Sequence, residues 1–222
     1  KALKNKKLFI LTYLRILFYI TIKIMIFKNI FIFVFLFALT KSNKSNNSTC
    51  PVVTPISNLN LTEYIKDKWY IQKQQVTSYL PLELNYCVTA QYKLSNKLIP
   101  FYFGEVLSVF NYANFNEVNG PSTNKNNFTL CARMRNETDP ARLLVAPCFL
   151  PNFFAGDYWV IAAGPSSNNY QWAIISGGQP TVQYPDGCTT RNDTSNGAGL
   201  WFFTRNQTVD SNVIDEMSKK VK

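Results

Sequence analysis

The chain has 222 residues, with 23 lysines and arginines against 13 aspartates and glutamates, a formal net charge of +10, and no histidine. Without histidine the chain cannot contain a Ser-His-Asp or Cys-His nucleophile, a histidine zinc ligand or a histidine general base. Eight basic residues and no acidic residue lie in residues 1–42, so the rest of the chain has 15 basic and 13 acidic residues and carries only +2. This nearly neutral body gives no reason to expect nucleic acid as a partner.

Residues 25–42 have the pattern of a secretory signal peptide. Met25 and Lys28 precede an apolar run from Ile30 to Leu39, and small or polar residues follow it. We interpret residues 1–24 as an upstream or non-native leader. The alternative is a membrane helix over residues 8–27, although the cations Arg15 and Lys23 oppose it. The prediction is therefore a secreted protein or one in the lumen of the secretory pathway, with membrane contact only through the N-terminal hydrophobic segment.

Sequons and cysteines also favour the secretory route. Sequons occur at Asn43, Asn46 and Asn47, and those predicted to be glycosylated surface sites are Asn60, Asn127, Asn136, Asn192 and Asn206. All five cysteines follow the signal, and none forms a Cys-x-x-Cys pair. This spacing favours disulfides over zinc binding or thiol redox catalysis. No metal or cofactor is expected.

The body of the chain reads as an all-β domain. A polar lead-in covers residues 43–57, and the domain proper covers residues 58–222. Short runs rich in β-branched and aromatic residues alternate there with turn signals, which predicts strands near 69–76, 85–94, 104–114, 126–135, 141–149, 157–163, 170–176 and 199–204. Gly164-Pro165 is one of the predicted turns. Apolar residues at helical spacing predict a single helix from Val209 to Val221, begun by Asp210 or Ser211.

Three segments of the chain resemble the motif regions of the lipocalin family. They are residues 58–70 with Trp69, residues 156–177 with Gly156-Asp157-Tyr158-Trp159, and residues 200–205 ending in Arg205. Residues 85–92 also look like the second strand of the group that contains apolipoprotein D and the bacterial outer-membrane lipocalins. The resemblance implies an eight-stranded antiparallel up-and-down barrel with a C-terminal helix. Two positions depart from the family pattern, since Asp67 replaces a usual glycine and Gln72 a usual aliphatic residue.

The resemblance also implies roles for two residues and for the cysteines. Trp69 is expected to lie at the closed end of the barrel with Arg205 stacked on it, as a structural pair that does not touch ligand. Cys131 and Cys148 flank the turn at Asp139-Pro140 and would face each other across two strands. A Cys50–Cys188 bridge resembles the apolipoprotein D arrangement, in which the partner of Cys87 would lie in a C-terminal tail that this chain lacks. The alternative pairing is Cys50–Cys148 with Cys87–Cys188.

The eight-stranded barrel that the resemblance implies has an interior wide enough for side chains or for one small ligand, and strand alternation sends every second residue inward. The predicted ligand-binding residues are Val88, Ala90, Tyr92, Phe110, Tyr112, Phe128, Val160, Trp172 and Ile174. The apolar segments 101–103 and 149–154 are predicted to lie in mouth loops. The function favoured is a carrier of a fatty acid, sterol, pigment or similar molecule. The alternatives are a membrane-tethered lipid-binding form and a lipocalin-fold enzyme acting on a lipid or pigment, for which Cys87 and Cys131 are the candidate nucleophiles.

Overall fold

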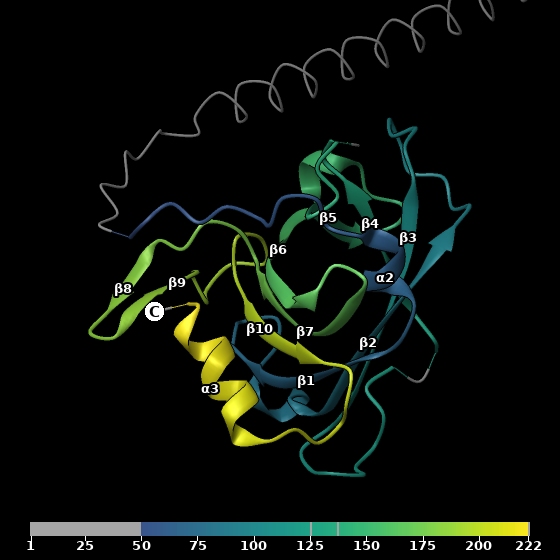
Figure 1. The fold of residues 1–222 in the computed structure, drawn as a ribbon. Coiled ribbons are helices and arrows are strands. Elements are labelled where there is room, and N and C mark those ends of the chain that lie inside the picture. The colour runs from purple at the N-terminus through teal and green to yellow at the C-terminus, as the bar shows by residue number, and fades with distance from the viewer. Residues whose placement is uncertain (1–49, 125, 137, 222) are drawn as a thin grey trace, which may run out of the picture. The chain divides into compact units, whose positions relative to one another are not determined.

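Eight strands close into an antiparallel barrel in the computed structural model, which describes residues 50–124, 126–136 and 138–221 (Figure 1). Around the barrel the order is β1-β10-β7-β6-β5-β4-β3-β2, so sequential strands are neighbours and β10 closes on β1. The strands are β1 Trp69–Gln74, β2 Tyr86–Ser95, β3 Val106–Asn114, β4 Thr129–Met134, β5 Arg142–Pro147, β6 Gly156–Ser166, β7 Asn169–Ser176 and β10 Leu200–Thr204. The predicted eight-stranded barrel is confirmed, and its topology is that of a lipocalin-like fold.

Among the described residues, two α-helices flank the barrel. The short helix α2, Leu61–Ile65, lies just before β1, and the Asn60 side chain accepts a hydrogen bond from the Glu63 amide at its start. The predicted C-terminal helix is present as α3, Ser211–Lys219, with Asp210 at its N-cap position but without a capping hydrogen bond from that side chain. Apolar residues of α3 pack with Ile174 and Phe202, which belong to β7 and β10. The helix therefore covers the outer face of these two strands.

The chain departs from the predicted elements at two places. Residues 182–184 and 187–189 form a small hairpin of strands β8 (Val182–Tyr184) and β9 (Gly187–Thr189) in the long connection before β10. The predicted turn at Gly164-Pro165 is wrong, because β6 continues through it to Ser166 with an irregularity in its register. A Cβ atom at Gly164 would lie 2.5 Å from the Trp172 ring, so glycine permits the close approach of that ring to the strand.

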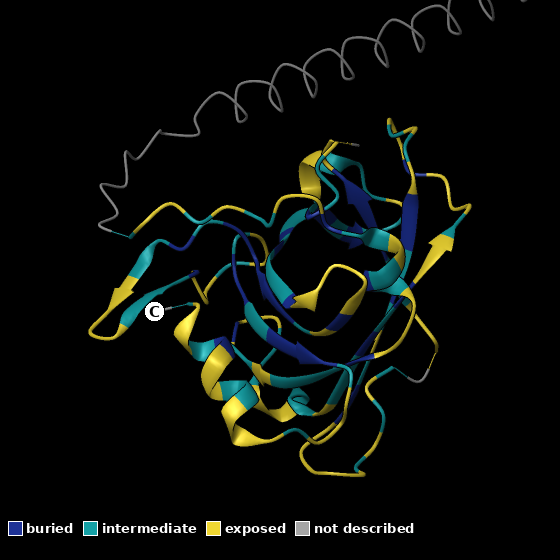
Figure 2. Ribbon diagram, viewed as in Figure 1, coloured by how far each residue is buried: buried dark blue, intermediate teal, exposed yellow. Residues whose placement is uncertain are grey.

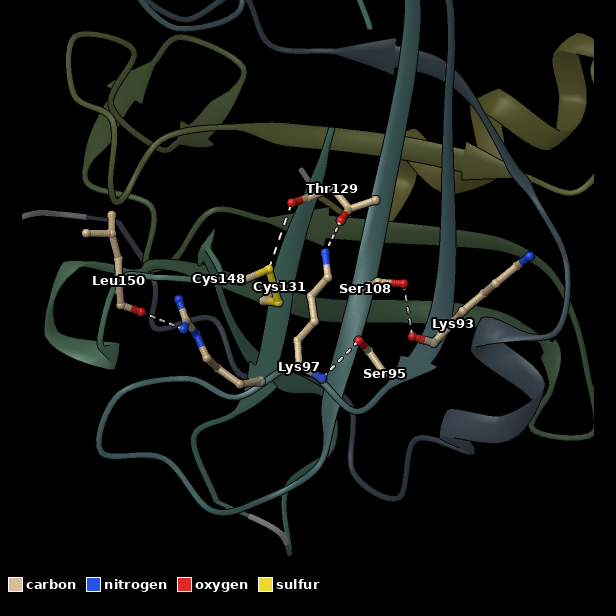
Figure 3. Close-up of a disulfide and its surroundings, with 9 residues drawn as sticks. Lys93, Ser95, Lys97, Ser108, Thr129, Cys131, Cys148 and Leu150 are labelled. Carbon is tan, nitrogen blue, oxygen red and sulfur yellow. Dashed lines mark hydrogen bonds between the residues drawn. A yellow bond between two sulfur atoms is a disulfide. The ribbon is translucent and has the colours of Figure 1, made fainter. Parts of the chain in front are cut away.

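The two disulfides that the sequence favoured are present, and the alternative pairing is not. Cys50–Cys188 ties the lead-in to β9, and Cys131–Cys148 joins β4 to the residue after β5 on the outside of the barrel (Figure 3). Cys131 does not face Cys148 directly as predicted, because its partner in the strand register is Ala146. The second bridge is therefore a diagonal one. Cys87 is exposed and forms no disulfide within the described residues.

The core occupies the barrel interior, with buried residues concentrated in the strands and exposed ones in loops and on the outer side of α3 (Figure 2). The antiparallel topology places α2, Trp69 and the β2–β3, β4–β5 and β6–β7 connections at one end of the barrel. The β1–β2, β3–β4, β5–β6 and β7–β10 connections lie at the other end. The first end is closed and the second is the mouth. The predicted signal peptide and leader, and the sequons at 43, 46 and 47, lie outside the described residues.

Candidate functional site

A cavity of about 710 Å³ occupies the mouth half of the barrel. Inward-facing side chains of several strands form its walls, and most of them are apolar, including Ile71, Ala90, Val109, Leu130, Val145 and Phe203. Cavities of several hundred cubic ångströms with apolar walls and few polar groups are typical of small-molecule sites. This cavity is therefore the candidate functional site of the described chain.

The four connections at the mouth frame the opening of the cavity. Leu84 comes from the β1–β2 connection, Thr123 from the β3–β4 connection, Leu150 and Phe154 from the β5–β6 connection, and Asn196 from the long connection before β10. The segment 149–154 was predicted to lie in a mouth loop, and the structure places it there. Several of its side chains are exposed at the opening, which leaves them free to meet an entering ligand.

Four of the nine residues predicted from alternation line the cavity. Val88, Ala90 and Tyr92 lie on β2, and Tyr112 lies near the end of β3 where it also borders an outer groove. Ala90 and Tyr92 are almost fully buried. The β2 register thus agrees with the alternation proposed for this strand, although an irregularity near Cys87 also brings Thr89 to the cavity.

Phe110 was predicted to point inward and does not line the cavity. Strand register pairs Val109 with Tyr92 and Phe110 with Gln91, so Val109 shares the inner face with Tyr92. The inner face of β3 continues with Asn111, a polar residue that lines the cavity near its opening. Because side chains alternate between the two faces, this one-residue difference moves Phe110 to the outer groove.

Four further predicted residues lie elsewhere in the fold. Trp172 and Ile174 are on the outer face of β7, where they pack in the cluster beneath α3. Val160 is fully buried in the main core and does not line the cavity. Phe128 precedes β4 and is 56% exposed, because the strand begins only at Thr129. The assignment of these residues to a ligand contact is therefore wrong for this cavity.

The prediction that residues 101–103 form part of the mouth is also wrong. They belong to the β2–β3 connection, at the opposite end of the barrel from the mouth. Ile99 and Tyr102 pack against Val106 and Cys131 on the outer wall, while Phe101 and Phe103 are exposed. Flanking proline and glycine marked the segment as a loop but carried no information about the end at which it lies.

Several cavity residues were not predicted. They are Ile71, Val109, Leu130, Val145, Trp201 and Phe203. The alternation of Trp201 and Phe203 along the sequence could have predicted that both line the cavity, because they share one face of β10. Leu130 shares its parity with Phe128 but lies within β4, whereas Phe128 precedes the strand and does not line the cavity.

Polar groups are few in the cavity wall. The Gln74 amide nitrogen bonds to Asn85, while its side-chain oxygen is buried and has no hydrogen-bond partner among the described residues. Asp157 lies toward the mouth and pairs with Arg135 at 2.9 Å. Deeper in the barrel, Tyr92 and Tyr158 line the cavity, and their hydroxyl oxygens are 2.7 Å apart. Burial raises the pKa of both tyrosines, so their hydroxyls stay protonated at neutral pH.

The closed end is held by Trp69 and Arg205, neither of which lines the cavity. The guanidinium carbon of Arg205 lies 3.5 Å from the Trp69 ring centroid, and Trp69 is fully buried. Arg205 also donates to the carbonyl oxygens of Glu63 at 2.8 Å and Tyr64 at 3.0 Å. The Trp69 indole donates to the same Tyr64 carbonyl at 2.9 Å. These contacts join α2, β1 and the end of β10, which is the structural role expected for the pair.

The two family departures are accommodated at this end. Asp67 has no left-handed backbone conformation, so its turn does not require glycine, and its carbonyl oxygen accepts a hydrogen bond from Arg205. The Gln72 amide donates to the Thr204 hydroxyl at 2.8 Å and so joins β1 to β10. Burial lowers the pKa of Arg205, and a hydrogen bond from Lys66 lowers the pKa of Glu63.

The predicted glycosylation sites differ in their environments. Asn127, Asn136, Asn192 and Asn206 are exposed. Asn60 is half-buried, and its side-chain oxygen is the cap of α2. Glycosylation at the four exposed positions and at Asn60 remains a prediction, with Asn60 the position where a glycan competes with a local contact.

Comparisons with known proteins add a distant structural likeness. No protein-family model matches the chain, and no curated protein sequence matches it. Among solved structures, the chain is similar to the crystal structure of the major allergen Per a 4 from cockroaches, with 16% sequence identity and a TM-score of 0.45. The match covers 78% of this chain and 85% of the allergen chain.

No helix in the ranges that the structure describes is long and apolar enough to cross a membrane. Across the same ranges, His, Cys, Asp and Glu side chains form no group of three that would suit a metal ion. The fold and the cavity together define a lipocalin-like barrel with an internal site of the size of a small ligand.

Proposed function

We propose that the protein is a carrier that binds one small hydrophobic molecule inside its barrel. The single observation that carries this proposal is the cavity of about 710 Å³, open at the mouth and walled mainly by apolar side chains. An apolar molecule transferred from water into such a site gains free energy in proportion to the apolar area that it loses to solvent. The few polar groups of the wall would orient the molecule.

The proposed setting is the secretory pathway or the extracellular space. Two disulfides support it, because such bonds persist in oxidising compartments. The proposed relationship to the group of apolipoprotein D and the bacterial outer-membrane lipocalins rests on the motif segments and on the Cys50–Cys188 bridge.

A binding role is preferred here to an enzymatic one. The enzyme alternative requires a reactive cysteine in the barrel, and the two candidates were Cys87 and Cys131. Cys131 is in a disulfide, and Cys87 borders the outer groove, not the cavity. Neither residue therefore favours the enzyme alternative, and the proposal is a binding role. A membrane-tethered carrier would depend on residues 8–27, which lie outside the described residues.

The test of the carrier is titration with N-phenyl-1-naphthylamine, a neutral fluorophore that brightens in apolar sites. We expect saturable binding of one fluorophore per chain. Val109→Trp fills the cavity from its wall and should weaken binding about tenfold or more, whereas Phe110→Trp, the next residue on the opposite face, should not. Absence of saturable binding to the folded parent protein, or equal binding by both variants, would contradict the proposal.

A further inference from the structure

Three tyrosines from distant parts of the chain meet inside the barrel. Tyr64 lies on α2, Tyr92 on β2 and Tyr158 on β6. The hydroxyl oxygen of Tyr158 is 2.6 Å from that of Tyr64 and 2.7 Å from that of Tyr92. All three side chains are at most 9% exposed. We call these residues the tyrosine cluster; two of its members, Tyr92 and Tyr158, line the cavity and Tyr64 does not.

The three hydroxyl donors of the tyrosine cluster share only two short hydrogen bonds. Each hydroxyl has one proton, and a hydroxyl can also accept. Two oxygen–oxygen contacts of hydrogen-bond length use two of the three protons, whichever way they are directed. The remaining pair, Tyr64 and Tyr92, interacts more weakly and lacks the short oxygen–oxygen contact of the other two pairs. Buried polar groups are normally well paired, so a cluster with one weak hydrogen bond and two members in the cavity wall favours a ligand that brings an acceptor to Tyr92 or Tyr158.

The charges around the cavity favour a neutral ligand oxygen over a carboxylate. No lysine or arginine is among the described residues that line the cavity, and Asp157 is the one charged residue among them. The charge of Arg205 acts on Tyr64 and Tyr92, but its guanidinium stacks on Trp69, donates to carbonyl oxygens at the closed end and does not line the cavity. A carboxylate placed in this cavity would lose its hydration without gaining a cation in direct contact, and that loss is costly. A neutral carbonyl or hydroxyl oxygen does not carry this cost.

The protonation state of the cluster suits a donor. Burial is the main cause that raises the pKa of Tyr64, Tyr92 and Tyr158. All three hydroxyls therefore keep their protons throughout the physiological pH range and cannot act as anions toward a ligand.

We propose that the tyrosine cluster is the polar anchor of the cavity and selects apolar ligands with a neutral oxygen acceptor over fatty-acid carboxylates. This inference rests on the proposed carrier function and narrows its ligand class. A ligand would enter with its carbonyl or hydroxyl oxygen toward Tyr92 and Tyr158 and leave its hydrocarbon part against the apolar walls. The selection is between ligands of equal chain length, so hydrocarbon burial alone cannot produce it.

The test compares three probes of similar length in displacement of N-phenyl-1-naphthylamine at neutral pH. They are 2-tridecanone, which is neutral and carries an acceptor, n-tridecane, which carries none, and dodecanoate, which is an anion. We expect 2-tridecanone to bind about tenfold more tightly than n-tridecane, as one buried hydrogen bond provides, and dodecanoate to bind more weakly than the ketone.

The matching variant is Tyr64→Phe/Tyr92→Phe/Tyr158→Phe, which keeps all three rings and removes all three hydroxyls. Replacing all partners of a hydrogen-bond network by apolar groups of the same shape leaves no buried donor or acceptor without a partner, so the variant should fold. The variant should bind n-tridecane as the parent does and lose the ketone preference. Tyr92→Phe/Tyr158→Phe is the second variant, and Tyr184→Phe is the control, because Tyr184 is exposed and does not line the cavity.

The outcomes separate the two proposals. A parent protein that binds the ketone and the alkane equally, or dodecanoate as tightly as the ketone, overturns the anchor and leaves the carrier standing. A ketone preference that survives in both multiple variants also overturns it. A folded parent protein that binds none of the probes, including the fluorophore, overturns the carrier itself.

Discussion

Replacing Arg205 by alanine should destabilise the barrel strongly while leaving the cavity intact. The substitution removes the stack on Trp69, whose centroid is 3.5 Å from the guanidinium carbon, and donors to the carbonyls of Glu63, Tyr64 and Tyr170. A desolvated cation–π contact contributes about 1–2 kcal/mol, and hydrogen bonds from a charged group about 1.5–3 kcal/mol each. These contributions overlap because they share one side chain.

The expected loss in the free energy of unfolding is therefore about 4 kcal/mol, near the upper end of single-substitution effects. For a domain of this size such a loss lowers Tm by about 8–16 °C. Affinity for the fluorophore, measured well below both melting temperatures, should change by less than about threefold, because Arg205 does not line the cavity.

Two control variants sharpen the measurement. Arg205→Lys keeps the charge but loses the planar fork of donors, so it should recover only part of the lost stability. Arg191→Ala removes an exposed ion pair with Asp193 and should leave Tm nearly unchanged, because solvent screens exposed pairs. The reasoning is refuted if Arg205→Ala melts within about 2 °C of the parent protein, or if it loses the fluorophore while remaining stable.

Two further predictions concern pH. A hydrogen bond from Lys66 lowers the pKa of Glu63 in the folded state. The contribution of Glu63 to stability is therefore complete above the ordinary glutamate pKa and is lost as pH falls through the folded value. Glu63→Gln should flatten the fall of Tm between about pH 5 and pH 3, and an unchanged slope would contradict this. The raised pKa values of the tyrosine cluster have the opposite consequence: its stabilisation is complete below the ordinary tyrosine pKa and is lost at higher pH. Absorbance titration of the folded protein should therefore leave at least these three tyrosines un-ionised at about pH 11, since burial also raises the pKa of Tyr79. The triple phenylalanine variant should lower the number of un-ionised tyrosines by three, and full ionisation of the parent protein at that pH would contradict the prediction.

Local residue patterns predicted the strands and the C-terminal helix, and the family resemblance added the barrel. Turn residues and β-branched runs are local signals, and each of the eight strands lies within a few residues of its predicted range. The ordered motifs around Trp69 and Arg205 pointed to the pair that closes the barrel. The favoured cysteine pairing could likewise be proposed before the structure, since it depends on chain order and resemblance.

Which face of each strand meets the cavity depends on contacts between distant parts of the chain, and local patterns do not contain that information. On β7 the residues from Ala173 to Ser176 are all buried, because the barrel covers one face and α3 the other, and so alternation disappears from the sequence. On β3 the inner face carries the polar Asn111 and the outer face the aromatic Phe110, which reverses the expectation from hydrophobicity. The tyrosine cluster joins residues separated by as many as 94 positions, and no local pattern can indicate that three hydroxyls will meet.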